Sequence, residues 1–177
     1  MFREDKTTQM AARFLQLATG RLPYIKLLKL LYLADKQMLI EHGKPITYDR
    51  WFALKLGPIL SATYNLIKCH DASEYWSHYI KTENYDIVFF SDPGSETLSV
   101  AEDRIIDAIF EKYKHHDKWQ IVDAVHQLSE WEDPGDTSKE MTYEAVLRVE
   151  GFEEEDINNT MENIHFQNDR RLVIMEH

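Results

Sequence analysis

The residues best suited to chemistry are Asp123, His126 and Glu130, two carboxylates and an imidazole in one short segment. On a helix, a spacing of i, i+3 and i+7 places all three side chains on one face, and both groups are common metal ligands. His115 and His116 stand in a predicted turn before them and could add ligands. A second helix would have to complete such a site. The alternative is a structural histidine that forms a hydrogen bond at the end of a packed helix.

Other catalytic signatures are missing from the sequence. It has no H-E-x-x-H motif, no cysteine pair, no glycine-rich phosphate loop and no G-x-S-x-G motif. Cys69 is the single cysteine, which excludes an intramolecular disulfide and agrees with a reducing cytosol. We expect a half-buried thiol rather than a nucleophile, because His70, its neighbour, would point about 100° away on a helix. The sequence therefore predicts no enzyme, cofactor or metal, with the metal-dependent enzyme kept as an alternative.

A central helix is predicted between residues 23 and 42, around the apolar run Leu27–Asp35. Pro23 favours its first turn and Gly43 its end. Lysines and Asp35 interrupt the run before it is long enough to cross a membrane. An aspartate in so apolar a helix must find a hydrogen-bond donor if it is buried, either a backbone amide or a lysine.

Apolar periodicity and capping residues predict further helices on both sides of the central one. Ser99 and Glu102 form a capping box, and Asp117 and Thr142 are further N-caps. Four expected helices span residues 4–19, 58–70 (opened by Pro58), 143–150 and 153–164. Two more follow the caps at Ser99 and Asp117, with apolar stripes that run from Ile105 to Tyr113 and from Ile121 to Leu128. The last ten residues are expected to fray.

Extended structure is predicted at two places. Residues 46–54 form a mixed run rich in aromatic residues, and residues 85–90 are the clearest strand, with residues 96–98 as its hairpin partner. The fold class is therefore mainly α (α+β), a compact single-domain helical fold with a small antiparallel sheet. One domain over 1–177 is expected, with a core at about 5–165 and a tail at 166–177.

The charge balance limits the partners. The net charge of −11 repels phosphate backbones, so direct nucleic-acid binding is not expected. The first residues lack the apolar segment of a secretion signal, so we expect a cytoplasmic protein without membrane contact. The acidic excess lies late, at Glu150 and residues 153–156. It either attracts a basic partner or solvates a surface and a helix N-terminus.

Several motifs together resemble a known family. The helix reading KLLYLAD at residues 29–35 with its flanks, GKPIT at 43–47, LGPILSATY at 56–64, and His126 followed by Trp131 occur in this order. This ordered set, over about residues 5–165, resembles the Panacea-domain, SocA-like antitoxins. The motif residues are candidates for structural roles or for a shared partner surface: Asp35, Trp51, Gly57, Pro58, Tyr64, His126 and Trp131.

The resemblance implies an antitoxin that binds a cognate toxin and suppresses it, with a basic toxin favoured by the acidic charge. A proteolytic adaptor, which delivers a toxin or another client to a protease, is the alternative. Three aromatic residues, Tyr75, Trp76 and Tyr79, lie where apolar periodicity is weak. We expect them to be exposed anchors for a partner, unless they cover the sheet.

Overall fold

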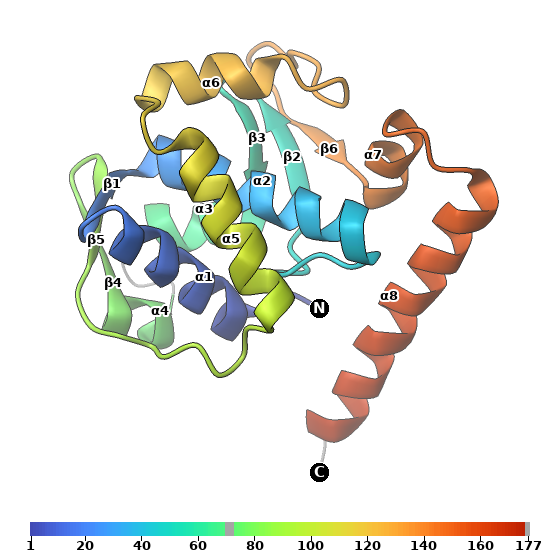
Figure 1. The fold of residues 1–177 in the computed structure, drawn as a ribbon, viewed down its shortest axis with the longest axis horizontal. Coiled ribbons are helices and arrows are strands. Elements are labelled where there is room, and N and C mark those ends of the chain that lie inside the picture. Colours follow the sequence, from blue (N-terminus) through green and yellow to red (C-terminus); the bar gives the residue numbers. More distant parts are fainter. Residues whose placement is uncertain (70–72, 176–177) are drawn as a thin grey trace.

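A computed structural model describes residues 1–69 and 73–175, with side chains described to residue 169. The described part contains eight helices and two small antiparallel sheets, which confirms the predicted α+β class (Figure 1). The helices are α1 (Glu4–Leu17), α2 (Tyr24–His42), α3 (Ser61–Lys68), α4 (Glu74–Tyr79), α5 (Val100–Tyr113), α6 (Lys118–His126), α7 (Tyr143–Val149) and α8 (Glu154–Met175). The strands are β1 (Arg21–Pro23), β2 (Trp51–Leu54), β3 (Gly57–Leu60), β4 (Ile80–Glu83), β5 (Asp86–Phe89) and β6 (Lys139–Met141).

The central helix α2 organises the molecule, as predicted. It is buried over most of its length, with α1, α5 and α6 packed against it (Figure 1). Gly43 ends it in the left-handed conformation at φ 65°, which glycine adopts without strain. Pro23 is the residue before the helix rather than part of its first turn, because it also closes β1.

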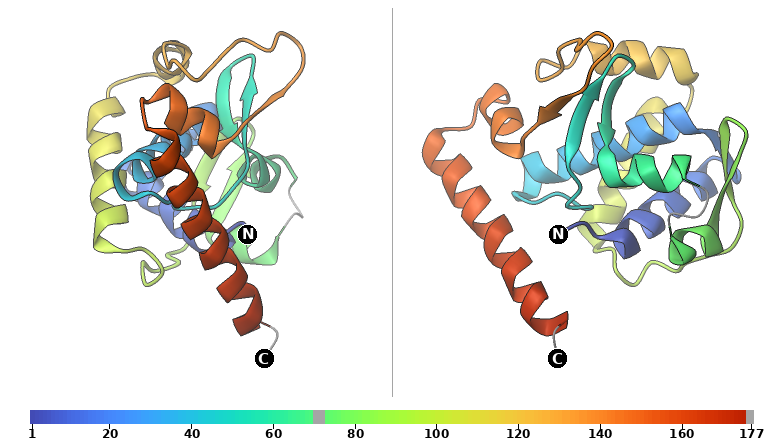
Figure 2. Two further views of the ribbon diagram at one scale, coloured as in Figure 1. Left: turned by 90° about the vertical axis from the view of Figure 1, so that its right-hand side faces the viewer. Right: turned by 180° about the vertical axis from the view of Figure 1, so that it is seen from behind.

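The two sheets lie on different sides of α2 (Figures 1 and 2). One has the order β1–β5–β4, and the other has the order β3–β2–β6. The predicted strand at 85–90 is present, but residues 96–98 are not its partner. It pairs with β4, which precedes it, and with β1 from the start of the chain. The partner β1 lies about sixty residues away in sequence, so local patterns could not reveal it.

The segment expected to be a helix from Pro58 begins as a strand. Residues 57–60 pair with β2 as a hairpin, and α3 starts only at Ser61. Proline is compatible with β3 because β3 is at the edge of its sheet, where one side needs no amide donor. The last residue of this predicted helix, residue 70, lies outside the described residues. Cys69 is exposed rather than half-buried, because it follows the helix in an extended conformation.

The capping predictions are confirmed. Ser99 and Glu102 form a capping box at α5, Asp117 forms one with Gln120 at α6, and Thr142 caps α7. The last predicted helix is longer than expected, because α8 continues to Met175 and so includes most of the predicted frayed tail. It runs along one edge of the molecule, with Ile157 and Ile164 buried (Figure 2).

Candidate functional site

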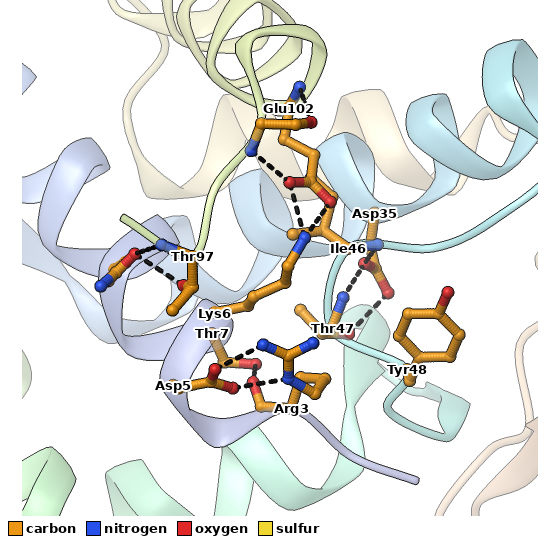
Figure 3. A network of polar contacts seen from close by, with 12 residues as sticks. Arg3, Asp5, Lys6, Thr7, Asp35, Ile46, Thr47, Tyr48, Thr97 and Glu102 are labelled. Carbon is orange, nitrogen blue, oxygen red and sulfur yellow. Dashed lines mark hydrogen bonds and ion pairs between the residues drawn. The ribbon is translucent and has the colours of Figure 1, made fainter. Parts of the chain in front are cut away.

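Asp35 joins the central helix to the chain that follows it. Its side chain is fully buried, and Oδ1 accepts hydrogen bonds from the amides of Ile46 (2.7 Å) and Thr47 (2.8 Å). Oδ2 accepts from Thr47 Oγ1 (2.7 Å) and from Trp51 Nε1 (2.9 Å). Figure 3 shows the carboxylate facing Ile46 and Thr47. Burial raises the pKa of Asp35 to about 6, against the effect of these donors. The expectation that Asp35 meets a backbone donor is confirmed.

Trp51 is also an interior residue, with 1% of its surface exposed. Its ring meets Tyr32 and Tyr143 edge-on, with centroid distances of 5.2 and 4.6 Å. Tyr143 in turn donates to the carbonyl oxygen of Asp49 at 2.6 Å. Trp51 therefore anchors β2 between α2 and α7, and it is not available to a partner in this conformation.

Gly57 and Pro58 are held against α2 and α6. Lys29 is 2% exposed, and its Nζ donates to the Pro58 carbonyl at 2.9 Å. Burial lowers the pKa of Lys29 to about 7. Gly57 has φ +96°, and a Cβ there would lie 2.6 Å from Cγ2 of Val125. Only glycine combines this backbone conformation with so close an approach of α6.

His126 and Trp131 stack on one another, with ring centroids 4.0 Å apart and planes 9° from parallel. The indole Nε1 of Trp131 donates to the Leu54 carbonyl at 3.2 Å. The pair therefore fixes the loop after α6 to the tip of the β2–β3 hairpin. Nε2 of His126 is buried and has no hydrogen-bond partner among the described residues.

The three residues predicted for a metal site do not share a helix face. The helix ends at His126, so Glu130 lies in the loop beyond it, while Asp123 is exposed. Glu130 is engaged elsewhere, because its Oε1 accepts from Tyr32 Oη (2.8 Å) and pairs with Lys36 Nζ (2.7 Å). His116 contacts the ring of Tyr113. In the described part of the chain, no three His, Cys, Asp or Glu side chains are grouped to hold a metal.

The aromatic segment of residues 75–79, which leads into β4, is exposed only in part. Tyr75 is 39% exposed and contacts the ring of Tyr79, which is partly buried, at 5.2 Å. Trp76 is 2% exposed, so the expectation of an exposed indole is wrong. Ser73 caps the short helix α4 through the Trp76 amide, and this helix turns the indole into the core.

Tyr64 is the motif residue at an accessible cavity, which we call the hairpin pocket. The cavity measures about 210 Å³ and lies between the start of α2, the tip of the β2–β3 hairpin and α3. Its lining includes Tyr24, Leu28, Leu54, Leu56 and Tyr64, and Leu56 is 40% exposed. The ammonium of Lys68 lies 3.8 Å from the ring centroid of Tyr24 and 5.8 Å from that of Tyr64.

The comparison with protein families agrees with this arrangement of motifs. The family model "Antitoxin SocA-like, Panacea domain" matches residues 27–132, which is more than half of the chain. The chain belongs to the SocA-like Panacea antitoxin family. No curated protein and no solved structure matched it. Within residues 1–69 and 73–175 of this Panacea protein, no helix has the length and apolar character needed to span a membrane.

The Panacea motifs thus meet around α2. Asp35 binds the segment after the helix, Lys29 binds the hairpin, and Tyr32 reaches the loop that contains Trp131. Sequence reasoning missed one part of this arrangement, the buried ionic group formed by Lys36 with Glu130 and Glu150, whose carboxylates lie 2.7 and 2.6 Å from its ammonium. The available signal was a tyrosine and a lysine four residues apart in an apolar helix, both needing polar partners.

Proposed function

We propose that this protein is an antitoxin that neutralises a cognate toxin by direct protein–protein binding. The observation that carries the proposal is the family match over residues 27–132. The polar motif residues support it, because Asp35, Lys29 and Glu130 are engaged in bonds that join elements of the fold. Such bonds hold a surface in one shape, which favours binding by lowering the entropy lost on association.

The toxin we propose is a basic protein. Eleven carboxylates and two cations, Lys139 and Arg148, lie between residues 130 and 156, so this stretch carries −9 of the net charge of −11. A field so localised accelerates the encounter with a positively charged partner and orients it. We therefore assign the acidic excess of residues 130–156 to the binding of this partner, rather than only to the solvation of the surface.

Among the motif residues, we assign toxin contact to Tyr64 and internal support to Asp35, Trp51, Gly57 and Pro58. The four supporting residues are buried, whereas Tyr64 is partly exposed and lines the hairpin pocket. Exposed aliphatic and aromatic groups such as Leu56 and Tyr64 are suited to the centre of an interface.

The test is expression together with the product of the neighbouring gene. We expect that this product alone arrests growth, that the antitoxin restores growth, and that the two proteins copurify. Growth that does not depend on this chain would contradict the proposal. In the same cells, an unchanged toxin half-life supports inhibition by binding, whereas a shortened half-life that requires a host protease would identify a proteolytic adaptor.

A further inference from the structure

A second cavity, which we call the acidic pocket, lies on the surface formed by β6, α7 and the loop around residues 129–132. It measures about 190 Å³, and its lining includes Glu130, Glu132, Glu140, Met141, Ala145 and Val149. Its walls thus combine carboxylates with apolar side chains. It lies inside the strongly acidic stretch of residues 130–156.

One oxygen of this pocket's buried carboxylate lacks a partner. The Glu130 side chain is 2% exposed, and its Oε1 already accepts from Tyr32 and pairs with Lys36. Its Oε2 is buried without a hydrogen bond among the described residues. A buried carboxylate oxygen is unfavourable until a donor satisfies it, and a cationic donor does so most strongly.

The cation within the pocket lining does not fill this role. Lys139 is the one lysine or arginine among the described residues that line the pocket, and its ammonium is paired with Glu132 at 2.5 Å. Glu140 is paired with Arg50 at 2.9 Å. Glu132 and Glu140 are therefore already paired with cations of the chain, whereas Oε2 of Glu130 keeps no hydrogen-bond partner among the described residues.

The shape of the pocket agrees with a long cationic side chain. Lysine and arginine bury their aliphatic stems along apolar surface while the charged end meets a polar group. Met141, Ala145 and Val149 supply such a surface, and Val149 is 48% exposed at the pocket. A cavity of this size accommodates one side chain.

We infer that the acidic pocket receives one lysine or arginine side chain of the toxin, with Oε2 of Glu130 as its acceptor and the Met141, Ala145 and Val149 side chains around its stem. This inference rests on the proposed antitoxin function. It adds the chemistry of the recognised residue and the place where it binds. Because the site is separate from the hairpin pocket, the two can be tested independently.

The first test compares the affinity of the toxin for three variants. Glu130→Gln keeps the oxygen that Tyr32 and Lys36 need but replaces the free acceptor with an NH2 group, so we expect at least about tenfold weaker binding. Val149→Arg places a cation of the chain itself at the pocket and should weaken binding similarly. Val100→Arg, at a residue 68% exposed in α5, is the matched control and should bind like the wild type. Circular dichroism confirms that each variant is folded.

If the wild type binds the toxin, and Glu130→Gln and Val149→Arg bind it with unchanged affinity, the proposed role of the pocket is overturned but the antitoxin function is not. If the wild type binds no toxin, the antitoxin proposal fails, and a peptide probe still decides the pocket. The tripeptide acetyl-Ala-Arg-Ala-amide at 10 mM should shift the amide signals of Ala145 and Val149, while its citrulline counterpart should not. Absence of an arginine-dependent shift refutes the site. Self-association that Glu130→Gln abolishes would make a second copy the occupant and also refute it.

Discussion

Asp35 shows how one side chain can define the path of a whole segment. Four donors from three residues converge on its two oxygens, and the residues that supply them lie 11 to 16 positions later in the chain. Because both oxygens are occupied, the segment from Ile46 to Trp51 is held against α2 without any regular secondary structure until β2. Asp35 is therefore a structural residue at the centre of the motif set.

Replacing Asp35 with asparagine should destabilise the protein by about 2–4 kcal/mol. In either orientation of the asparagine, its NH2 group faces donors, which are the two backbone amides in one case and the Thr47 and Trp51 side chains in the other. Because NH2 cannot accept a hydrogen bond, two donors are left unsatisfied. The free energy of unfolding in urea at pH 7.5 measures this loss. Asp136→Asn, at an exposed position with 93% of its side chain accessible, should change it by less than about 0.5 kcal/mol. Equal losses in the two variants would contradict the role of Asp35.

The lowered pKa of the buried Lys29 predicts that the stability of the protein depends on pH. Its pKa is lowered from 10.5 to about 7 because burial penalises the charged form. The folded state therefore binds fewer protons than the unfolded state between about pH 7 and pH 10, and the free energy of unfolding rises with pH in this window. From pH 7 to pH 9 the gain from this group is about 2 kcal/mol.

Urea unfolding at both pH values isolates the contribution of Lys29. In Lys29→Met the gain disappears, because methionine has no proton to lose, whereas Lys112→Met, at an exposed lysine, should keep the slope of the wild type. A Lys29→Met protein that retains the full increase would show that another group is responsible.

At the scale of elements, the β2–β3 hairpin depends on its close contact with α6. Gly57→Ala should destabilise the protein by about 2–4 kcal/mol, because the methyl group would lie 2.6 Å from Val125 Cγ2 and φ would stay at +96°. Adding Val125→Ala removes the clash but not the backbone strain. The double variant should therefore be less destabilised than the sum of the two single variants. Thermal unfolding of all three measures this coupling, and strict additivity would argue against the contact.

The sequence predicts elements well where the determinants are local. The caps at Ser99, Asp117 and Thr142 each need residues within one turn, and all three are present in the structure. Pro58 misled the prediction because the rule that proline opens a helix competes with its tolerance in an edge strand, and the edge becomes visible only when the sheet is assembled. The prediction that residues 96–98 pair with β5 was wrong for a related reason. The partner β1 lies just before α2, far from β5 in the sequence, and the pairing becomes visible only in the assembled sheet.

The candidate site follows the same division. That Asp35 needs a donor could be predicted from its residue type and its neighbours. That Glu130 meets Tyr32, 98 residues earlier in the chain, could not, because a loop residue carries no periodicity and the expected helix face placed it beside Asp123. Burial of Trp76 depended on a six-residue helix too short for its own pattern to be recognised.

At the scale of the whole molecule, the uneven charge predicts the salt dependence of the proposed association with a basic toxin. The association rate constant should fall at least about tenfold between 0.05 and 0.5 M salt, because screening removes the long-range attraction of residues 130–156. Stopped-flow mixing measures the rate. Neutralising two exposed carboxylates, as in Glu153→Gln with Glu155→Gln, should reduce the salt dependence. A rate indifferent to salt would contradict a basic toxin.

The sheet β3–β2–β6 takes two strands from inside the family match and its third strand from beyond residue 132. The ladder to β6 uses backbone groups of β2, so many different sequences can occupy this position without disturbing Asp35, Lys29 or the stacked His126 and Trp131. The segment after Trp131 is thus joined to the matched region by this backbone ladder and by side-chain contacts that include the ring of Tyr143 on Trp51 and the ion pair of Glu150 with Lys36. An exchange of this segment between two Panacea proteins that keeps Tyr143 and Glu150 would test the proposed role of residues 130–156, and it should transfer the choice of toxin together with the segment.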